Sequence, residues 1–256
     1  MTLSLFSLIP VSDTEWFIWS MAVLGSILVG IAKGGLKGIG IAIVTVFALA
    51  FGSRASTGIL VPLLIIGDTL AVIYYNRHTR WSILLKLIPW TLIGLLLGVW
   101  YGMDLEEALF KQVMAAIIIV CVIMMFWWDR KPLSYVPDNW WFAGIMGVIT
   151  GFTTMIGNLA GPFANIFFLA IRLPKNEFIG TTAWMFFILN IVKLPFHIWT
   201  WGTITRESLM INLKIGWIVV LGFVVGVRLV YFIQERQFRY LILSLTALGA
   251  IVILLR

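Results

Sequence analysis

Charged side chains are scarce in this sequence. Only 11% of its 256 residues are Asp, Glu, Lys or Arg, whereas 61% are hydrophobic and the mean hydropathy is +1.04. A typical soluble domain carries about 25% charged residues, so this composition excludes a soluble enzyme and a secreted disulfide scaffold. One bilayer crossing takes about 20 apolar residues, so the chain has room for roughly ten crossings and no large domain outside the membrane.

Cysteine and histidine are nearly absent as well. The single cysteine, Cys121, cannot form a disulfide within the chain and lies in an apolar stretch. There are two histidines, and no zinc-ligand spacing, nucleophile elbow or phosphate-binding loop accompanies them. We therefore expect no enzyme, no metal ion and no cofactor. His78 fits a basic turn, and His197 is expected to reach toward the membrane interface.

The net charge of +7 has a topological explanation. Lys and Arg stand mainly in short connections between apolar stretches, so we expect a lipid bilayer and not a nucleic acid around the protein. Ten of the connection residues fall on one side of the membrane and four on the other. The richer side is expected to be cytoplasmic, which predicts a multi-pass protein of the bacterial inner membrane with both termini in the periplasm.

Ten apolar segments are predicted along the chain. The longest polar connection, residues 129–139, contains two prolines and is the expected cytoplasmic linker. It separates a first repeat, residues 1–128, from a second repeat, residues 140–256, within one membrane domain. The segments run approximately over residues 16–32, 39–51, 58–75, 82–101, 110–128, 140–157, 159–171, 178–200, 208–233 and 238–255.

The two halves share a rhythm and some local sequence. Gly58–Asp68 aligns with Gly180–Asn190, and Gly94-x-x-x-Gly98 resembles Gly222-x-x-x-Gly226. Five elements per half is an odd number, so the second half enters the membrane from the opposite face. We therefore predict an all-α polytopic membrane protein made of two inverted five-element repeats. In each repeat the first two elements are expected to be short or broken helices, whether they cross fully or re-enter.

Gly-rich breaks occupy corresponding places in the two halves, at residues 32–40 and 153–162. Broken helices expose backbone N–H groups and helix N-termini, and such breaks are the best sequence indication of a substrate site in transporters. The alternative is an ordinary loop whose glycines allow close helix packing. Lys33 and Lys37 would favour an anion, although the orientation rule explains them equally well. Candidate binding residues here are Lys33, Gly34, Gly35, Lys37, Gly38, Gly157, Asn158, Gly161 and Asn165.

Asp68 and Lys193 lie deepest within their apolar segments. A carboxylate at that depth usually faces a partner or an interior path. Asn190 aligns with Asp68, and Lys193 follows Asn190 by one helical turn, so the three side chains could meet between the repeats. They could form a coupling site or a structural charge pair. Thr57, Thr181 and Asn190 complete the candidate binding residues, because their polar groups stand beside glycines or at buried positions.

Three stretches resemble the TauE/SafE family of sulfite and organosulfur anion exporters. They are residues 32–38 (AKGGLKG), 53–64 (SRASTGILVPLL) and 72–78 (VIYYNRH), and the resemblance extends over both halves, from about Gly25 to Leu255. It implies export of sulfite or a related sulfur oxyanion or organosulfonate across a bacterial inner membrane. Lys33 and Lys37 interrupt the glycine run that the family often follows with Ser or Thr, so the resemblance leaves the substrate open.

The leading hypothesis is therefore a secondary transporter that exports a small sulfur-containing anion by alternating access. An importer of thiosulfate or another small anion on the same scaffold is the alternative within transport. An intramembrane enzyme would need a nucleophile–base pair, which the two histidines hardly supply. A membrane scaffold without transport activity would bind no such ligand. The sequence leaves a homodimer open.

Overall fold

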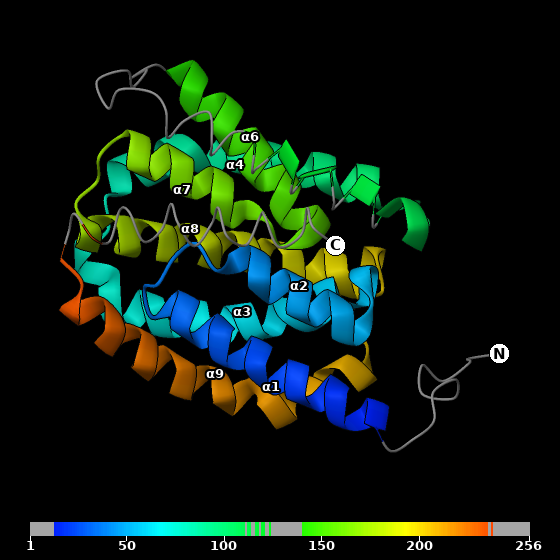
Figure 1. Ribbon diagram of the computed structural model, residues 1–256. Helices are drawn as coiled ribbons and strands as arrows, with labels where there is room; N and C mark the ends of the chain where they lie inside the picture. Colours follow the sequence, from blue (N-terminus) through cyan, green and yellow to red (C-terminus); the bar gives the residue numbers. More distant parts are fainter. Residues whose placement is uncertain are drawn as a thin grey trace.

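All regular structure among the described residues is helical. The computed structural model describes residues 13–110 and 140–234, and in addition residues 112–113, 116–117, 119–120, 123 and 237. The helices are α1 (Asp13–Lys33), α2 (Gly40–Phe51), α3 (Ser53–Tyr75), α4 (Trp81–Gly102), α6 (Trp140–Gly157), α7 (Ala160–Ala170), α8 (Lys175–Pro195) and α9 (Arg206–Phe232), with a 3₁₀ turn η1 (Asn76–His78) and a π-helical turn η2 (Phe196–Thr200) (Figure 1).

Six of these helices, α1, α3, α4, α6, α8 and α9, are long and apolar enough to cross a bilayer. The chain is thus a polytopic membrane protein, as its composition predicts. The helices α2 and α7 have only 12 and 11 residues, so at 1.5 Å per residue they are about 16–18 Å long and too short to cross.

The prediction that the first two elements of each repeat are short is right for the second element and wrong for the first. The helices α1 and α6 have 21 and 18 residues. The reason is that the Gly-rich breaks follow these helices and do not interrupt them. Eight of the ten predicted segments correspond to helices. The remaining two, 110–128 and 238–255, and the linker 129–139 lie outside the continuously described ranges.

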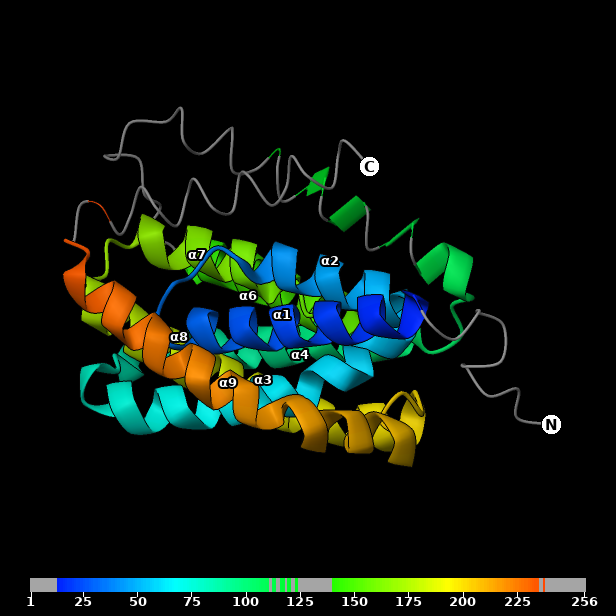
Figure 2. The same ribbon diagram turned by 60° about the horizontal axis from the view of Figure 1, so that its bottom comes forward.

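The long helices pack as two outer pairs on either side of a central pair. In the bundle α1 packs along α9 and α4 along α6, while α3 and α8 pack against each other between these pairs (Figure 1). The short helices α2 and α7 lie next to each other on one face of the bundle (Figure 2). Since α1 precedes α2 and α6 precedes α7, this arrangement brings the two Gly-rich breaks together.

Glycine allows the outer helix pairs to approach closely. A Cβ on Gly94 would overlap the carbonyl oxygen of Val148, and a Cβ on Gly151 would overlap that of Thr91. Between α1 and α9, Gly222 stands in the same relation to the carbonyl oxygen of Ile27. The paired Gly-x-x-x-Gly motifs are therefore sites of helix–helix contact, as in other membrane bundles.

Gly151→Ala should consequently destabilise the α4–α6 pair. Relieving the overlap with Thr91 requires the helices to move apart, and overpacking of this kind costs about 1–3 kcal/mol. Gly144→Ala, on the same helix, is the matched control because its Cβ would lie 3.5 Å from the Trp90 ring, an ordinary contact. Thermal unfolding in detergent compares the two variants, and equal melting temperatures would contradict this packing.

The connections at the two ends of the bundle pack in similar ways, each against a glycine of a neighbouring helix. The connection after α3 rests on α8, where a Cβ on Gly180 would lie 2.7 Å from the carbonyl oxygen of Tyr75. The connection after α8 rests on α3, where a Cβ on Gly58 would overlap the carbonyl of Thr203. Arg80 further fixes the first connection through Glu177, with Nε 2.6 Å from Oε2. The hydrogen bond and charge of Glu177 raise the pKa of the Arg80 guanidinium.

Candidate functional site

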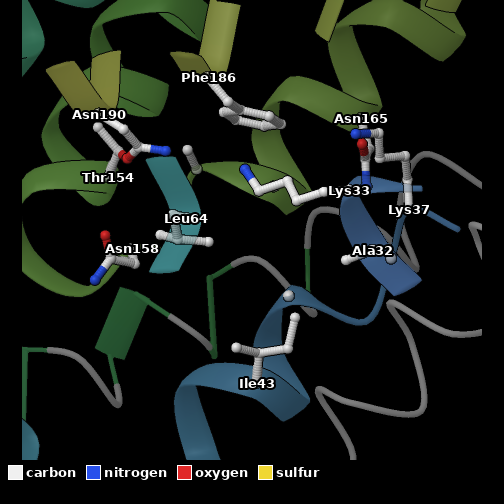
Figure 3. A pocket seen from close by; sticks show the side chains of 14 residues that line it. Ala32, Lys33, Lys37, Ile43, Leu64, Thr154, Asn158, Asn165, Phe186 and Asn190 are labelled. Carbon is white, nitrogen blue, oxygen red and sulfur yellow. The ribbon is translucent and has the colours of Figure 1, made fainter. Parts of the chain in front are cut away.

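A cavity of about 80 Å³ lies where the two Gly-rich breaks meet. One water needs about 10–15 Å³ on this measure, so the cavity has room for several waters or for a small ion. Both halves of the chain contribute to it. The lining residues are Ala32, Lys33, Lys37, Gly38, Gly40, Ile43 and Leu64 from the first half, and Thr154, Asn158, Ala160, Gly161, Asn165, Phe186 and Asn190 from the second (Figure 3).

The backbone of the breaks turns two helix N-termini toward this cavity. Gly38 has a φ of 103° and Asn158 a φ of 56°, values that favour glycine and are tolerated by asparagine. The helices α2 and α7 then begin without a side-chain N-cap. A Cβ on Gly40 or Gly161 would meet nothing within 4 Å, so these first-turn residues border open space. Their N–H groups and helix dipoles favour negative charge in the cavity.

Lys33 reaches across the cavity toward Asn190, below the ring of Phe186 (Figure 3). Its Nζ donates to Asp68 Oδ1 at 2.6 Å, and Asn190 Nδ2 donates to Asp68 Oδ2 at 2.6 Å. Asp68 is fully buried. A buried carboxylate is stable only with such partners, so this network joins α1, α3 and α8 at the core of the bundle.

Lys193 joins the second break to α8. Its Nζ donates to the carbonyl and hydroxyl oxygens of Thr154, both at 3.2 Å, and to Asn158 Oδ1 at 2.5 Å. The structure thus brings Asp68 and Asn190 together as their alignment suggests. The lysine that pairs with Asp68, however, is Lys33, and Lys193 instead holds the break at Asn158.

Among the described residues, Lys37 has no carboxylate partner, although it lines the cavity. It is only 5% exposed and takes part in neither the Lys33–Asp68 nor the Arg80–Glu177 ion pair. Its Nζ lies 5.8 Å from the centre of the Phe186 ring. Asn165, 3% exposed, also lines the cavity, and its Oδ1 has no hydrogen-bond partner in the described part of the chain. In the described part of this site, the ammonium groups of Lys33, Lys37 and Lys193 outnumber the single carboxylate of Asp68. This excess of positive charge favours an anionic ligand.

A comparison with protein families identifies the chain. The family model described as sulfite exporter TauE/SafE matches residues 22–253, which include both breaks and every residue of the cavity. The chain belongs to the TauE/SafE family. The resemblance seen in its sequence motifs is confirmed, and TauE/SafE membership implies a membrane transporter of a small anion and not an enzyme. No curated protein and no solved structure matches the chain.

Several residues that the sequence proposes as anion contacts in this TauE/SafE protein lie outside the cavity lining. Gly34 packs against α9, where a Cβ would lie 2.6 Å from the carbonyl oxygen of Phe223, and Gly35 packs against Tyr75 and Ile179. Two hydroxyls are engaged elsewhere, since Thr57 donates to Arg54 O and Thr181 accepts from Arg80 N. Gly157 is the buried last residue of α6.

Seven cavity residues of this TauE/SafE protein were not candidates from sequence: Ala32, Gly40, Ile43, Leu64, Thr154, Ala160 and Phe186. Gly40 and Thr154 lie within the predicted breaks and could have been found by testing every residue there. Phe186 is one apolar residue among many, and no sequence signal distinguishes it. It contributes an aromatic ring, with Lys33 Nζ 4.9 Å from the ring centre. A ring face attracts a cation, so Phe186 helps to position the ammonium groups.

The expected position of His197 is wrong. It does not reach toward an interface but is fully buried, because the π-helical turn after Pro195 keeps its side chain inside the bundle. Its Nδ1 lies 2.7 Å from Thr203 Oγ1. Within the described ranges, no three His, Cys, Asp or Glu side chains lie close enough together to hold a metal ion.

Proposed function

We propose that the protein exports sulfite, or a sulfur oxyanion of similar size, and that the anion binds in the cavity between the two breaks. Lys37 carries this proposal, because its ammonium group borders the cavity, is nearly buried and has no carboxylate partner within the described ranges. Burying a lone charge is costly, and a bound anion would offset that cost. The size of the cavity favours a compact inorganic oxyanion over an organosulfonate with a long tail.

The first turns of α2 and α7 would hold the anion from the other sides. Backbone N–H groups and helix dipoles bind oxyanions at helix N-termini, and Gly40 and Gly161 leave these groups uncovered. The Asn165 side chain could donate to the anion through its amide nitrogen. Asp68 is not expected to repel the anion strongly, because Lys33 and Asn190 already hold its two oxygens.

We infer further that two inverted repeats provide alternating access, with residues 1–128 and 140–256 rocking against each other. Three correspondences support this division. The pair α1–α9 matches the pair α6–α4 in order and in its glycine contacts. Gly58 and Gly180 are aligned in sequence and make matching contacts. The connection after α8 packs against Gly58 of α3, and the connection after α3 packs against Gly180 of α8. The aligned residues Asp68 and Asn190 are hydrogen-bonded to each other, as residues near a pseudo-two-fold axis would be.

Export needs no coupling ion on energetic grounds. In an inner membrane that is negative inside, an anion leaving the cytoplasm gains about 2.3 kcal/mol per charge per 100 mV. Asp68 is the candidate if a proton is coupled to transport. An importer of thiosulfate on the same scaffold would have to work against this potential and would need such coupling.

Proteoliposomes loaded with sulfite test the proposal. A potential negative inside should drive sulfite out, and a potential of opposite sign should reverse the flux, because the charge follows the field. Liposomes without protein provide the background. The absence of sulfite flux above that background, from protein that unfolds cooperatively, would reject the proposal. Thiosulfate uptake that requires an inward proton gradient would favour the importer.

A further inference from the structure

A line of polar side chains runs from the cavity toward the end of the bundle where α8 is connected to α9. Asn158 lines the cavity and accepts a hydrogen bond from Lys193 Nζ. His197 follows Lys193 by four residues, in the π-helical turn that continues α8 toward this end of the bundle. An anion that leaves the cavity past Asn158 in this direction would meet Lys193 first and His197 next.

His197 lies under the connection formed by residues 201–205. Its carbonyl oxygen accepts from the N–H groups of Thr203 at 2.9 Å and Ile204 at 3.1 Å, and its Nδ1 lies 2.7 Å from Thr203 Oγ1. Trp201 covers the site, since it is 7% exposed, its ring centre is 5.2 Å from that of His197 and its Nε1 donates to Val99 O. The connection itself rests on α3 at Gly58.

The second ring nitrogen of His197 is unpaired. The residue is fully buried, and Nε2 has no hydrogen-bond partner among the described residues. When the Thr203 hydroxyl donates to Nδ1, the proton of a neutral imidazole is on Nε2, which is then an N–H donor without an acceptor. Two cations lie near this ring, because Lys193 precedes it by four residues on α8 and the Arg54 guanidinium lies 5.6 Å from the centre of the Trp201 ring that packs on His197. Glu107 is also at this end, where its Oε1 accepts from Ser53 N and Arg54 N.

A buried N–H donor with two cations nearby is suited to an anion. We propose that His197 Nε2 is a second anion contact, on the route between the cavity and this end of the bundle. It is reached when the connection 201–205 lifts away from Gly58, and Trp201 is the apolar barrier that closes the route in the present conformation. This inference rests on the proposed export of an anion and adds a residue and a closing segment to it.

Two substitutions of His197 separate its two nitrogen atoms. His197→Asn retains an amide near the position of Nδ1 and can still bond to Thr203, whereas His197→Gln places its amide near the position of Nε2. Thr203→Val is the matched control, because it removes the bond to Nδ1 and leaves Nε2 in place. Each protein is reconstituted for sulfite efflux, and binding in the cavity is measured separately as protection by sulfite against thermal unfolding.

We expect His197→Asn to lower the maximal efflux rate about ten-fold while sulfite protection changes less than about two-fold, because the cavity is untouched. His197→Gln should recover efflux to within about three-fold of the unchanged protein, and Thr203→Val should lose no more than about two-fold. These results would show that the donor at Nε2 acts on the passing anion.

Three results would overturn the inference. They are full efflux in His197→Asn, equal losses in the Asn and Gln variants, and a loss in Thr203→Val as large as that in His197→Asn. Each would mean that His197 only holds the connection. If His197→Asn does not fold, a loss of efflux in Thr203→Val larger than that in His197→Gln overturns the inference, because Thr203→Val leaves Nε2 in place. Failure of the proposed function is distinguishable, because the unchanged protein would then show no sulfite efflux.

Discussion

Lys37→Gln is expected to lower the affinity for sulfite about 100-fold, because truncating one partner of a buried charge pair costs 2–5 kcal/mol. The lost charge belongs to a lysine that lines the cavity and has no carboxylate partner in the described part of the chain, so the bound anion loses its strongest attraction. The unliganded protein should be at least as stable as before, because a lone buried ammonium is itself costly. A weaker site in a protein of equal or greater stability distinguishes a binding lysine from a structural one.

Sulfite-dependent protection against thermal unfolding measures this affinity, and efflux from proteoliposomes measures transport. Lys86→Gln is the matched control, because Lys86 is exposed on α4 and the substitution removes the same charge outside the cavity. It should change neither quantity by more than about two-fold, since exposed charges are screened. Equal effects of the two substitutions would mean that Lys37 attracts anions only through the net charge of the protein.

Asp68→Ala is expected to destabilise the fold by about 3–5 kcal/mol, because it leaves a buried ammonium without its partner. Lys33 would lose the carboxylate that it binds, and Asn190 would lose the acceptor of its amide hydrogen bond. The double substitution Lys33→Met with Asp68→Leu should recover most of the loss, since apolar residues of similar volume can replace a buried ion pair. That recovery would show that the pair is structural, whatever else Asp68 does.

Thermal unfolding in detergent compares the single and double variants. The other ion pair named above provides the control. Glu177→Gln breaks the bond to Arg80, whose side chain is 57% exposed, and should shift the melting temperature only slightly. If Asp68→Ala were no more harmful than Glu177→Gln, the buried pair would contribute little to the fold.

The hydropathy of the sequence was sufficient to predict the positions of most of the helices. Long apolar stretches have few alternatives to helix in a bilayer, where every backbone N–H and C=O must be hydrogen-bonded. The lengths of α2 and α7 followed from the same pattern. The predicted shortness of α1 and α6 did not hold, because a glycine cluster indicates a break without indicating whether the preceding helix has already crossed the membrane.

The candidate site could be predicted only in part. The depth of Asp68 in an apolar segment marked it as a residue with a partner, and the repeat alignment placed Asn190 next to it. The sequence indicated Lys193 as the lysine beside Asp68, and this was wrong, because Asp68 pairs with Lys33. The alignment could not reveal that partner, which depends on how far the end of α1 reaches toward α3.

The sequence by itself determined the class of the protein, its apolar helices and the residues in its two breaks. These follow from local composition, because the bilayer excludes charge and unpaired backbone wherever they occur. Only the tertiary structure decided that both breaks line one cavity, that Lys37 faces it with no carboxylate partner among the residues described, and that His197 is buried under a connection. Those features depend on contacts between distant segments, and their geometry is set by the packing of whole helices.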